Sequence, residues 1–287
     1  MIIPDYFIIE PTRVCNFSCF MCPNRFYKQN EKGHMELLTY TKIINQIAPY
    51  AKAIQLYWMG EPLLHPHILD FIKIAKRETK ANVIVSTNGS LLTPNFSDAL
   101  LNTGIDKLII DVDASSPVTY SKVRRGGDYS SLVASIKYLL AKNQNTDIIL
   151  QFLDFKINRA DLPGFFSQWE DEPCSLRVDW IDTWAGQMPE LASLAYSISP
   201  YFGETRMPCA DLWHKATINY LGEINLCCHD YKRIHSFGNI IDTDLIKIWN
   251  SIELNVIRES HLLGVFNGLC KNCIEWAKES EYEELMV

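Results

Sequence analysis

Three cysteines fall within eight residues near the start of the chain, at Cys15, Cys19 and Cys22. In a reducing compartment, clustered thiols are typically metal ligands, and an odd number of them cannot pair evenly as disulfides. Zinc sites generally use four ligands in two separated pairs, although zinc with an open position remains an alternative. A [4Fe-4S] cluster binds one thiolate at each iron, so three cysteines leave one iron open. The spacing therefore predicts an iron–sulfur cluster with a vacant coordination position.

A second set of cysteines lies in the last third of the chain, at Cys209, Cys227, Cys228, Cys270 and Cys273. Four thiolates from this set are enough to ligate every iron of a second [4Fe-4S] cluster. A structural zinc ion on the same side chains is the alternative. The sequence thus predicts two metal centres with different coordination, one open and one closed.

The composition limits the kind of protein that carries these cysteines. The 287 residues are 47% hydrophobic and 21% charged, which is typical of a globular chain with a sizeable core. A net charge of −7, without any basic block, argues against nucleic acid and anionic membranes as partners. The first residues do not form an export signal, and no apolar run is long enough to span a bilayer. We therefore expect a cytoplasmic protein.

The elements that must position the first cysteines are short apolar runs that alternate with helical patterns. The predicted strands are 7–10, 54–58, 82–86, 107–113, 147–153 and 176–181, and the predicted helices are 39–50, 67–77, 95–102, 129–142 and 161–169. Six alternations predict an α/β fold whose parallel sheet curls into a partial (β/α)6 TIM-like barrel. A doubly wound open sheet is the alternative.

The alternation stops after about residue 189. Residues 193–209 are typical of a linker, residues 215–228 of a hairpin with its turn at Gly222-Glu223, and residues 244–263 of a helix. We therefore divide the chain into a barrel domain, residues 1–195, and a small C-terminal cluster-binding domain, residues 196–287.

Polar residues follow the predicted strands at their carboxyl ends. In parallel α/β folds this edge of the sheet carries the chemistry, because the loops that follow the strands meet there. The candidate residues at these positions are Gly60, Glu61, Pro62, Thr87, Asn88, Asp111, Asp113 and Asp182.

The motif C-x3-C-x2-C after a first strand, with Gly60-Glu61-Pro62 after the second, resembles the radical SAM superfamily. The resemblance implies a partial (β/α)6 barrel in which S-adenosylmethionine binds the open iron through its amino and carboxylate groups. It also implies that Glu61 contacts the amino group, and a buried cation needs such an acceptor. Met21 matches an apolar position near the adenine in the superfamily, although a packing role is equally compatible with its place in the loop.

Two later segments extend the resemblance. Residues 86–89, Ser-Thr-Asn-Gly, are similar to the end of strand three near the bound cofactor, so Thr87 and Asn88 are implied cofactor contacts; Asn-Gly is also a turn signal. Residues 111–129 are similar to the stretch after strand four, but Asp111 stands where serine is common. An extra anion near a carboxylate is unfavourable, so we expect Asp111 to face a ribose hydroxyl or the substrate. Of the adjacent arginines, we predict that Arg125 binds the cofactor carboxylate.

The C-terminal cysteines and their flanking residues resemble the SPASM and twitch domains, which hold auxiliary clusters. This resemblance implies one auxiliary [4Fe-4S] cluster, and therefore two clusters per chain. Relatives with an adjacent cysteine pair generally use the first member, which favours Cys227 over Cys228. The implied ligands are Cys209, Cys227, Cys270 and Cys273.

The resemblance implies reductive cleavage of S-adenosylmethionine to a 5′-deoxyadenosyl radical that abstracts a substrate hydrogen, with a flavodoxin- or ferredoxin-type reductant as partner. Similarity to 2-deoxy-scyllo-inosamine dehydrogenase-like enzymes favours net oxidation of a small hydroxylated or sugar-like substrate, with the auxiliary cluster as electron acceptor. Asp113 and Asp182 are the predicted catalytic residues, which would position substrate or take a hydroxyl proton. One alternative is cross-linking or epimerisation of a ribosomal peptide, which is less favoured because the N-terminal recognition domain common among such enzymes is not expected here. The other alternative is a non-catalytic electron-transfer or binding protein.

Overall fold

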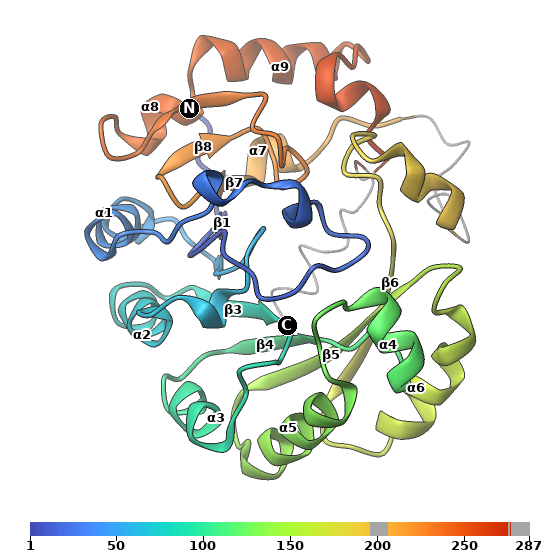
Figure 1. Ribbon diagram of the computed structural model, residues 1–287. Helices are drawn as coiled ribbons and strands as arrows, with labels where there is room; N and C mark the ends of the chain where they lie inside the picture. The colour runs from blue at the N-terminus through green and yellow to red at the C-terminus, as the bar shows by residue number, and fades with distance from the viewer. Residues whose placement is uncertain (196–205, 275, 277–287) are drawn as a thin grey trace.

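The computed structural model describes residues 1–195, 206–274 and 276, and nine strands within these residues form one sheet (Figure 1). The strand order is β6-β5-β4-β3-β2-β1-β7-β8-β9. The bounds are β1 Tyr6–Ile9, β2 Ala53–Gln55, β3 Asn82–Thr87, β4 Lys107–Asp111, β5 Asp147–Asp154, β6 Ser175–Trp180, β7 Lys215–Ile218, β8 Glu223–Asn225 and β9 Ser236–Asn239.

Strands β1 to β6 lie in sequential order, and each is parallel to the next. A doubly wound sheet reverses its strand order at a central switch point, so the sequential order excludes that alternative. The predicted α/β fold with a partial barrel is confirmed. The six strands lie within a few residues of their predicted positions because each is an apolar run bounded by turn residues.

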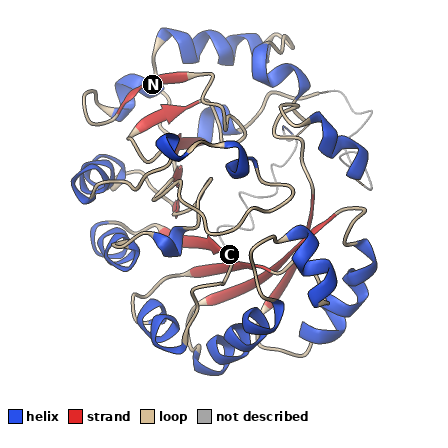
Figure 2. Ribbon diagram, viewed as in Figure 1, coloured by secondary structure: helices blue, strands red, loops and turns tan. Residues whose placement is uncertain are grey.

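Helices cover the outer face of the curved sheet, as Figure 2 shows. The helices of the first part are α1 Leu37–Ile47, α2 Ile68–Glu78, α3 Pro94–Leu101, α4 Pro117–Val123, α5 Tyr129–Lys142 and α6 Leu162–Trp169, with 3-10 turns at Pro23–Phe26, Gln29–Glu31, Pro62–Leu64, Arg159–Asp161 and Pro189–Leu194. Helix α4 was not predicted, although Ser116 and Pro117 are an N-cap and a first-turn residue of the usual kinds.

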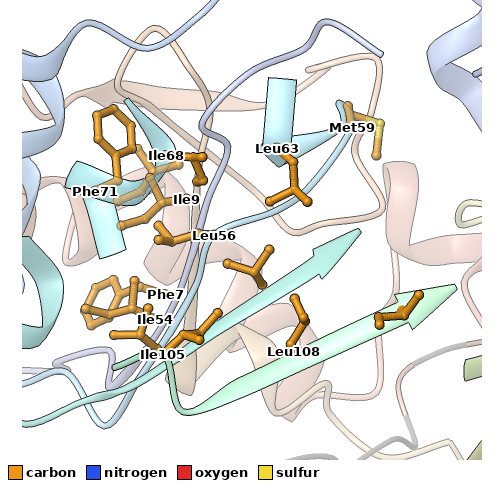
Figure 3. Close-up of a cluster of buried hydrophobic side chains, with 14 of the residues drawn as sticks. Phe7, Ile9, Ile54, Leu56, Met59, Leu63, Ile68, Phe71, Ile105 and Leu108 are labelled. Carbon is orange, nitrogen blue, oxygen red and sulfur yellow. The ribbon is translucent and has the colours of Figure 1, made fainter. Parts of the chain in front are cut away.

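The main core lies between the outer face of the sheet and these helices. Apolar side chains from β1 and β2 pack against the helix side, and Figure 3 shows Phe7, Ile9, Ile54 and Leu56 within this cluster. The inner face has a much smaller apolar cluster, formed by Tyr6, Ala53, Ile84 and Ile109. The inner face near the carboxyl ends is therefore left to polar residues.

The C-terminal part of the chain continues the same sheet. Strand β7 runs parallel to β1, with Tyr6 opposite Lys215, and β8 and β9 add antiparallel strands. The further helices are α7 Asp211–His214, α8 Leu245–Trp249 and α9 Ile252–Leu262, followed by a 3-10 turn at Gly268–Asn272. The predicted hairpin is present, but the single helix expected over 244–263 is divided, because Ser251 caps α9 by accepting from the Leu254 amide at 3.4 Å.

The predicted linker, residues 193–209, lies largely outside the described residues, so the boundary between residues 195 and 196 stays a prediction. Among the helices that the structure describes, none has the length and apolar character needed to cross a bilayer.

Candidate functional site

The cysteine loop follows β1 and closes over the carboxyl end of the sheet. Cys15, Cys19 and Cys22 line one cavity of about 110 Å³ together with side chains that follow β2, β3 and β4. The backbone holds the loop in place, because the Ser18 amide donates to the Arg125 carbonyl at 2.8 Å and the Phe20 amide donates to the Val123 carbonyl at 3.0 Å. The structure thus brings the three predicted ligands to one cavity.

The three thiols of this loop are suited to become ligands of a cluster at the time when the metal enters the site. Burial raises the pKa of Cys15 to about 11 and that of Cys22 to about 12, and it also raises the pKa of Cys19. Within the described residues, no three His, Cys, Asp or Glu side chains already stand in a geometry that would hold a metal ion. Metal-bound thiolates lose their protons on binding, and such sites commonly form only as the metal enters. The donor set fits an iron–sulfur cluster.

Glu61 is a buried carboxylate at the wall of the same cavity. Its Oε1 accepts hydrogen bonds from the Thr87 hydroxyl at 2.7 Å and the Leu63 amide at 3.0 Å, and its Oε2 accepts from the Asn88 amide at 2.8 Å. Burial nevertheless raises the pKa of Glu61 to about 7. A carboxylate held in this way fits an ammonium group that enters the cavity, because the cation compensates for the desolvated charge.

Gly60 lets this turn approach the cysteine loop. A Cβ atom at Gly60 would lie 2.1 Å from the Thr12 carbonyl oxygen and 2.7 Å from the Val14 carbonyl oxygen. The Glu61 amide also donates to the Val14 carbonyl at 2.9 Å. The glycine of the Gly-Glu-Pro turn is therefore required by backbone contact, and the buried Pro62 begins the 3-10 turn that follows.

Arg124 is the cation of the cavity. Its guanidinium pairs with Asp111 at 3.3 Å and donates from Nε to Asp113 Oδ2 at 2.6 Å, and its Nη1 lies 3.8 Å from the Cys19 sulfur. Asp111 lines the cavity, and its contact with a ribose hydroxyl or the substrate stays a prediction. Arg124 neutralises the extra anion at this position, which the sequence alone did not reveal.

Two predicted site residues lie elsewhere. Arg125 was expected at the cofactor carboxylate, but it is exposed and packs on the Phe20 ring, whereas Arg124 lines the cavity. Asp113 was expected to face substrate, but it is fully buried and holds Arg124 and the Leu153 amide, the latter at 2.6 Å. Burial raises the pKa of Asp113 and the Arg124 charge opposes that rise. Asp113 thus orients the arginine.

Met21 is buried within the loop and does not line the cavity. Its carbonyl oxygen accepts from Trp184 Nε1 at 3.1 Å. Trp184 and Ala185 both adopt left-handed backbone conformations, with φ of 54° and 55°, which side-chain-bearing residues rarely adopt. This strained turn after β6 therefore fixes the tryptophan between the cysteine loop and the C-terminal part of the chain.

The predicted auxiliary ligands lie together beside β7 and β8. The Cys227 thiol interacts electrostatically with Cys228, Cys273 and Cys209, and Cys209 interacts in the same way with Cys273 and Cys270. Burial raises the pKa of both Cys209 and Cys227 well above the usual value of a thiol. The arrangement fits a second cluster, because four thiolates supply one ligand to each iron.

A second cavity, of about 220 Å³, lies on the inner face of the sheet and has Cys228, the neighbour of Cys227, in its wall. Tyr57 and Trp58 line both this cavity and the cavity at the cysteine loop. The predicted residue Asp182 is in its wall, with its carboxylate accepting from the Trp184 amide. The other residues of the wall are Ile8, Gln55, Trp184, Asp211, Lys215, Cys228 and His229.

Several of these lining residues were not predicted. Gln55 is 5% exposed and stands inside an apolar strand, and Lys215 is also 5% exposed at the start of another. Lys215 Nζ lies 3.2 Å from Asp211 Oδ1. A polar residue within an apolar run was the available signal, because such a side chain is buried only where a partner or a cavity receives it.

The chain belongs to the radical SAM superfamily. The model of that superfamily matches residues 9–159, more than half of the chain, and the model of an iron–sulfur cluster-binding domain, SPASM, matches residues 209–274. The predicted family is confirmed, and membership implies a [4Fe-4S] cluster and S-adenosylmethionine as cofactors.

Among individual proteins, the chain is similar to the S-adenosyl-L-methionine-dependent 2-deoxy-scyllo-inosamine dehydrogenase of Niallia circulans, with 23% identity over 97% of this chain and 96% of that protein. A probable GTP 3′,8-cyclase of Methanocaldococcus jannaschii is 27% identical over 69% of this chain and 65% of that protein.

Solved structures share the fold. BtrN in complex with AdoMet and 2-DOIA has a TM-score of 0.65 at 20% identity, covering 94% of this chain and 93% of that one. Streptococcus suis SuiB bound to the precursor peptide SuiA has a TM-score of 0.74 at 14% identity, covering 95% of this chain and 71% of that one.

Proposed function

We propose that this radical SAM enzyme oxidises a small hydroxylated substrate by removal of two electrons and two protons, with an auxiliary [4Fe-4S] cluster, the second in the chain, as electron acceptor. The observation that carries the proposal is the cavity of about 220 Å³ that shares Tyr57 and Trp58 with the cysteine-loop cavity and reaches Cys228 beside the second cysteine set. A substrate in this cavity would lie between the two redox centres.

When bound, the first cluster and S-adenosylmethionine supply a 5′-deoxyadenosyl radical that removes one hydrogen atom from the substrate. The chain's own residues bind and orient the reactants. Glu61 would hold the amino group of the cofactor, and Arg124, fixed by Asp113, would hold its carboxylate. Asp182, in the wall of the second cavity, would take the hydroxyl proton, and the remaining electron would pass to the auxiliary cluster.

The size and lining of the second cavity favour a small polar molecule. Drug-sized ligands occupy pockets of about 300–1,000 Å³, so this cavity accommodates one small ring rather than a folded peptide loop. Trp58 and Trp184 supply apolar walls, while Gln55 and Asp182 supply hydrogen-bonding groups. Asp211, Lys215 and His229 add further polar groups to the wall, which suits a small ring that carries several hydroxyl groups.

Anaerobic reconstitution tests this function directly. The protein is loaded with iron and sulfide, reduced with dithionite, and mixed with S-adenosylmethionine and 2-deoxy-scyllo-inosamine that carries deuterium at its carbinol carbons. The expected result is 5′-deoxyadenosine that contains deuterium, together with a ketone product. The matched control replaces Cys15, Cys19 and Cys22 with alanine, which should abolish cofactor cleavage and leave the iron of the second set.

Two outcomes would contradict the proposal. Cleavage that persists in the triple variant would remove the cysteine loop from the reaction. Deuterium-free 5′-deoxyadenosine with this compound and with a panel of other amino- and hydroxy-substituted rings, but turnover of a peptide, would move the chain to peptide modification.

A further inference from the structure

Three consecutive residues after β6 adopt left-handed backbone conformations. The φ angles are 54° at Trp184, 55° at Ala185 and 80° at Gly186. Glycine tolerates this region, but a residue with a Cβ atom is strained there, and left-handed residues ordinarily occur singly. Such a conformation persists only where the surrounding contacts hold it, and it is found most often at functional sites. We define the left-handed turn as residues 183–188.

Polar side chains next to Trp184 in the sequence hold the left-handed turn. The Asp182 carboxylate accepts a hydrogen bond from the Trp184 amide. The Thr183 hydroxyl accepts from the Gly186 amide at 3.0 Å. Gln187 Nε2 donates to the Trp184 carbonyl oxygen at 3.1 Å. Both backbone polar groups of Trp184 are therefore held by side chains.

The left-handed turn also contacts both cysteine-bearing parts of the chain. Trp184 Nε1 donates to the Met21 carbonyl oxygen at 3.1 Å, inside the first cysteine loop. Gln187 Nε2 donates to the His229 carbonyl oxygen at 2.7 Å, directly after the Cys227-Cys228 pair. The indole of Trp184 is thus placed by contacts with the loops that carry the two predicted metal centres.

Trp184 and Trp58 contribute apolar surface to the wall of the second cavity. The only polar atom of an indole ring is Nε1. The Met21 carbonyl uses this donor in Trp184, and the Cys228 carbonyl uses it in Trp58, at 2.6 Å. Both rings therefore offer only carbon surface to a bound molecule. The face of an aromatic ring is negative, so it attracts C–H groups, which are positive at hydrogen.

We propose that Trp184 determines which rings the second cavity accepts, by packing its indole against a ring face made of axial C–H groups. The proposal rests on the proposed function, because it assigns a structural feature to the substrate of the same cavity. A saturated six-membered ring with only equatorial substituents presents axial hydrogens on both faces. An axial hydroxyl would be pressed against the indole without a hydrogen-bond partner, which is unfavourable. No bond forms or breaks in this contact.

Binding of two inositol isomers tests the contact without turnover. In scyllo-inositol all hydroxyl groups are equatorial, whereas chiro-inositol has two adjacent axial hydroxyl groups, one on each face. Calorimetry measures the affinity of the reconstituted protein for each isomer. Trp184→Leu removes the ring, and Trp184→Phe keeps a ring face without the N–H group. Trp213→Leu is the control, because this half-buried indole on α7 is not part of the wall of either cavity.

The unaltered protein should bind scyllo-inositol about tenfold more tightly than chiro-inositol, since one unpartnered hydroxyl has a cost of this size. Trp184→Leu should weaken binding of the scyllo isomer until the two affinities are similar. Trp184→Phe should retain most of the preference, and Trp213→Leu should retain all of it. Iron content should be the same in every variant.

Equal affinities for the two isomers in the unaltered protein would overturn the proposal, whether or not the variants fold. Equal losses in Trp184→Leu and Trp184→Phe, or no measurable binding of either isomer, would also overturn it. Failure of the proposed function is distinguishable. In that case the isomers would bind with the expected preference, but labelled 2-deoxy-scyllo-inosamine would give 5′-deoxyadenosine without deuterium.

Discussion

Arg124 and Asp113 form a buried ion pair in which the arginine Nε donates to the carboxylate at 2.6 Å. Asp113 has no exposed surface and adopts a left-handed φ of 56°, and its other oxygen accepts from the Leu153 amide at 2.6 Å. The aspartate therefore fixes the arginine, whose Nη1 also pairs with Asp111 at 3.3 Å. The ion pair connects the end of β4 with the turn after α4.

Removal of Arg124 should lower the stability of the folded protein. Arg124→Met leaves Asp111 and Asp113 without their shared cation, and one of these carboxylates is fully buried. We expect a loss of about 3 kcal/mol in the free energy of unfolding, since breaking one partner of a buried pair strands the other charge. Urea unfolding measures the change. Arg125→Met is the matched control and should be close to neutral, and equal losses in both variants would contradict the assignment.

Neutralising Glu61 should separate cofactor binding from cluster assembly. Glu61→Gln keeps the shape but replaces one carboxylate oxygen with an amide group, so the bonds from Thr87, Asn88 and Leu63 cannot all persist. A charge-assisted hydrogen bond contributes about 1.5–3 kcal/mol, so affinity for S-adenosylmethionine should fall about 10- to 100-fold. Calorimetry measures the affinity, and iron content should stay unchanged. Unchanged affinity would exclude Glu61 from the amino-group site.

Adding one carbon at Gly60 should displace the Gly-Glu-Pro turn from the cysteine loop. The new Cβ in Gly60→Ala would meet the Thr12 carbonyl oxygen at 2.1 Å, far inside contact distance. Because backbone must move, we expect lower iron retention in the first cluster and a loss of stability. Gly104→Ala is the control variant. The Cβ atom added at residue 104 would meet no atom within 4 Å, and an alanine at this φ of 75° would lower the stability by only about 1 kcal/mol. A larger loss in Gly104→Ala than in Gly60→Ala would refute the argument.

Substitution of Cys227 should lower the iron content of the protein, whereas substitution of the adjacent Cys228 should not. The Cys227 thiol interacts with Cys228, Cys273 and Cys209, whereas Cys228 also lines the second cavity, where its carbonyl oxygen accepts from Trp58 Nε1 at 2.6 Å. The reconstituted protein should hold about eight irons, as two cubanes require. Cys227→Ser should retain about half of this iron, and Cys228→Ser should retain nearly all of it. The reverse pattern would assign the ligand role to Cys228.

His65 should make the protein less stable as pH falls below neutrality. Burial lowers the pKa of His65 to about 4 in the folded chain, where its Nδ1 accepts from the His67 amide at 3.0 Å and its Nε2 lies 2.9 Å from the Met35 carbonyl oxygen. The unfolded chain binds a proton near pH 6.5, so between pH 6.5 and 4 protonation favours unfolding. The urea midpoint should decline over this range. The decline should be smaller in His65→Gln, and identical slopes would contradict the mechanism.

Much of the barrel was predictable from local pattern. The strands that became β1 to β6 are apolar runs with turn residues at their ends, and sheets buried on both sides leave this simple signal. The cysteine loop was predictable because three closely spaced thiols suit a cluster with an open iron, and the Gly60-Glu61 turn was predictable because it resembles a motif of the superfamily. Each of these features is set within a few residues of chain.

The remainder depended on contacts between distant segments. Nothing local distinguishes Arg124 from Arg125, and their separation follows from Asp111 and Asp113 on one side of the turn and Phe20 on the other. The pairing of β7 with β1 is likewise a long-range contact, because Glu10 and the Tyr220 amide that it binds are 210 residues apart in the sequence. Such contacts are fixed by the assembled sheet rather than by either segment.

The place of β1 in the sheet has a consequence for synthesis on the ribosome. Tyr6–Ile9 is made before the other strands of this sheet, yet its second neighbour, β7, ends at Ile218. Until that residue leaves the exit tunnel, one side of β1 has open backbone donors and acceptors, beside a loop of reactive thiols. During most of its synthesis, the nascent chain therefore has an unpaired strand edge next to Cys15, Cys19 and Cys22. The sheet beside the cysteine loop is therefore completed only after three quarters of the chain has been made.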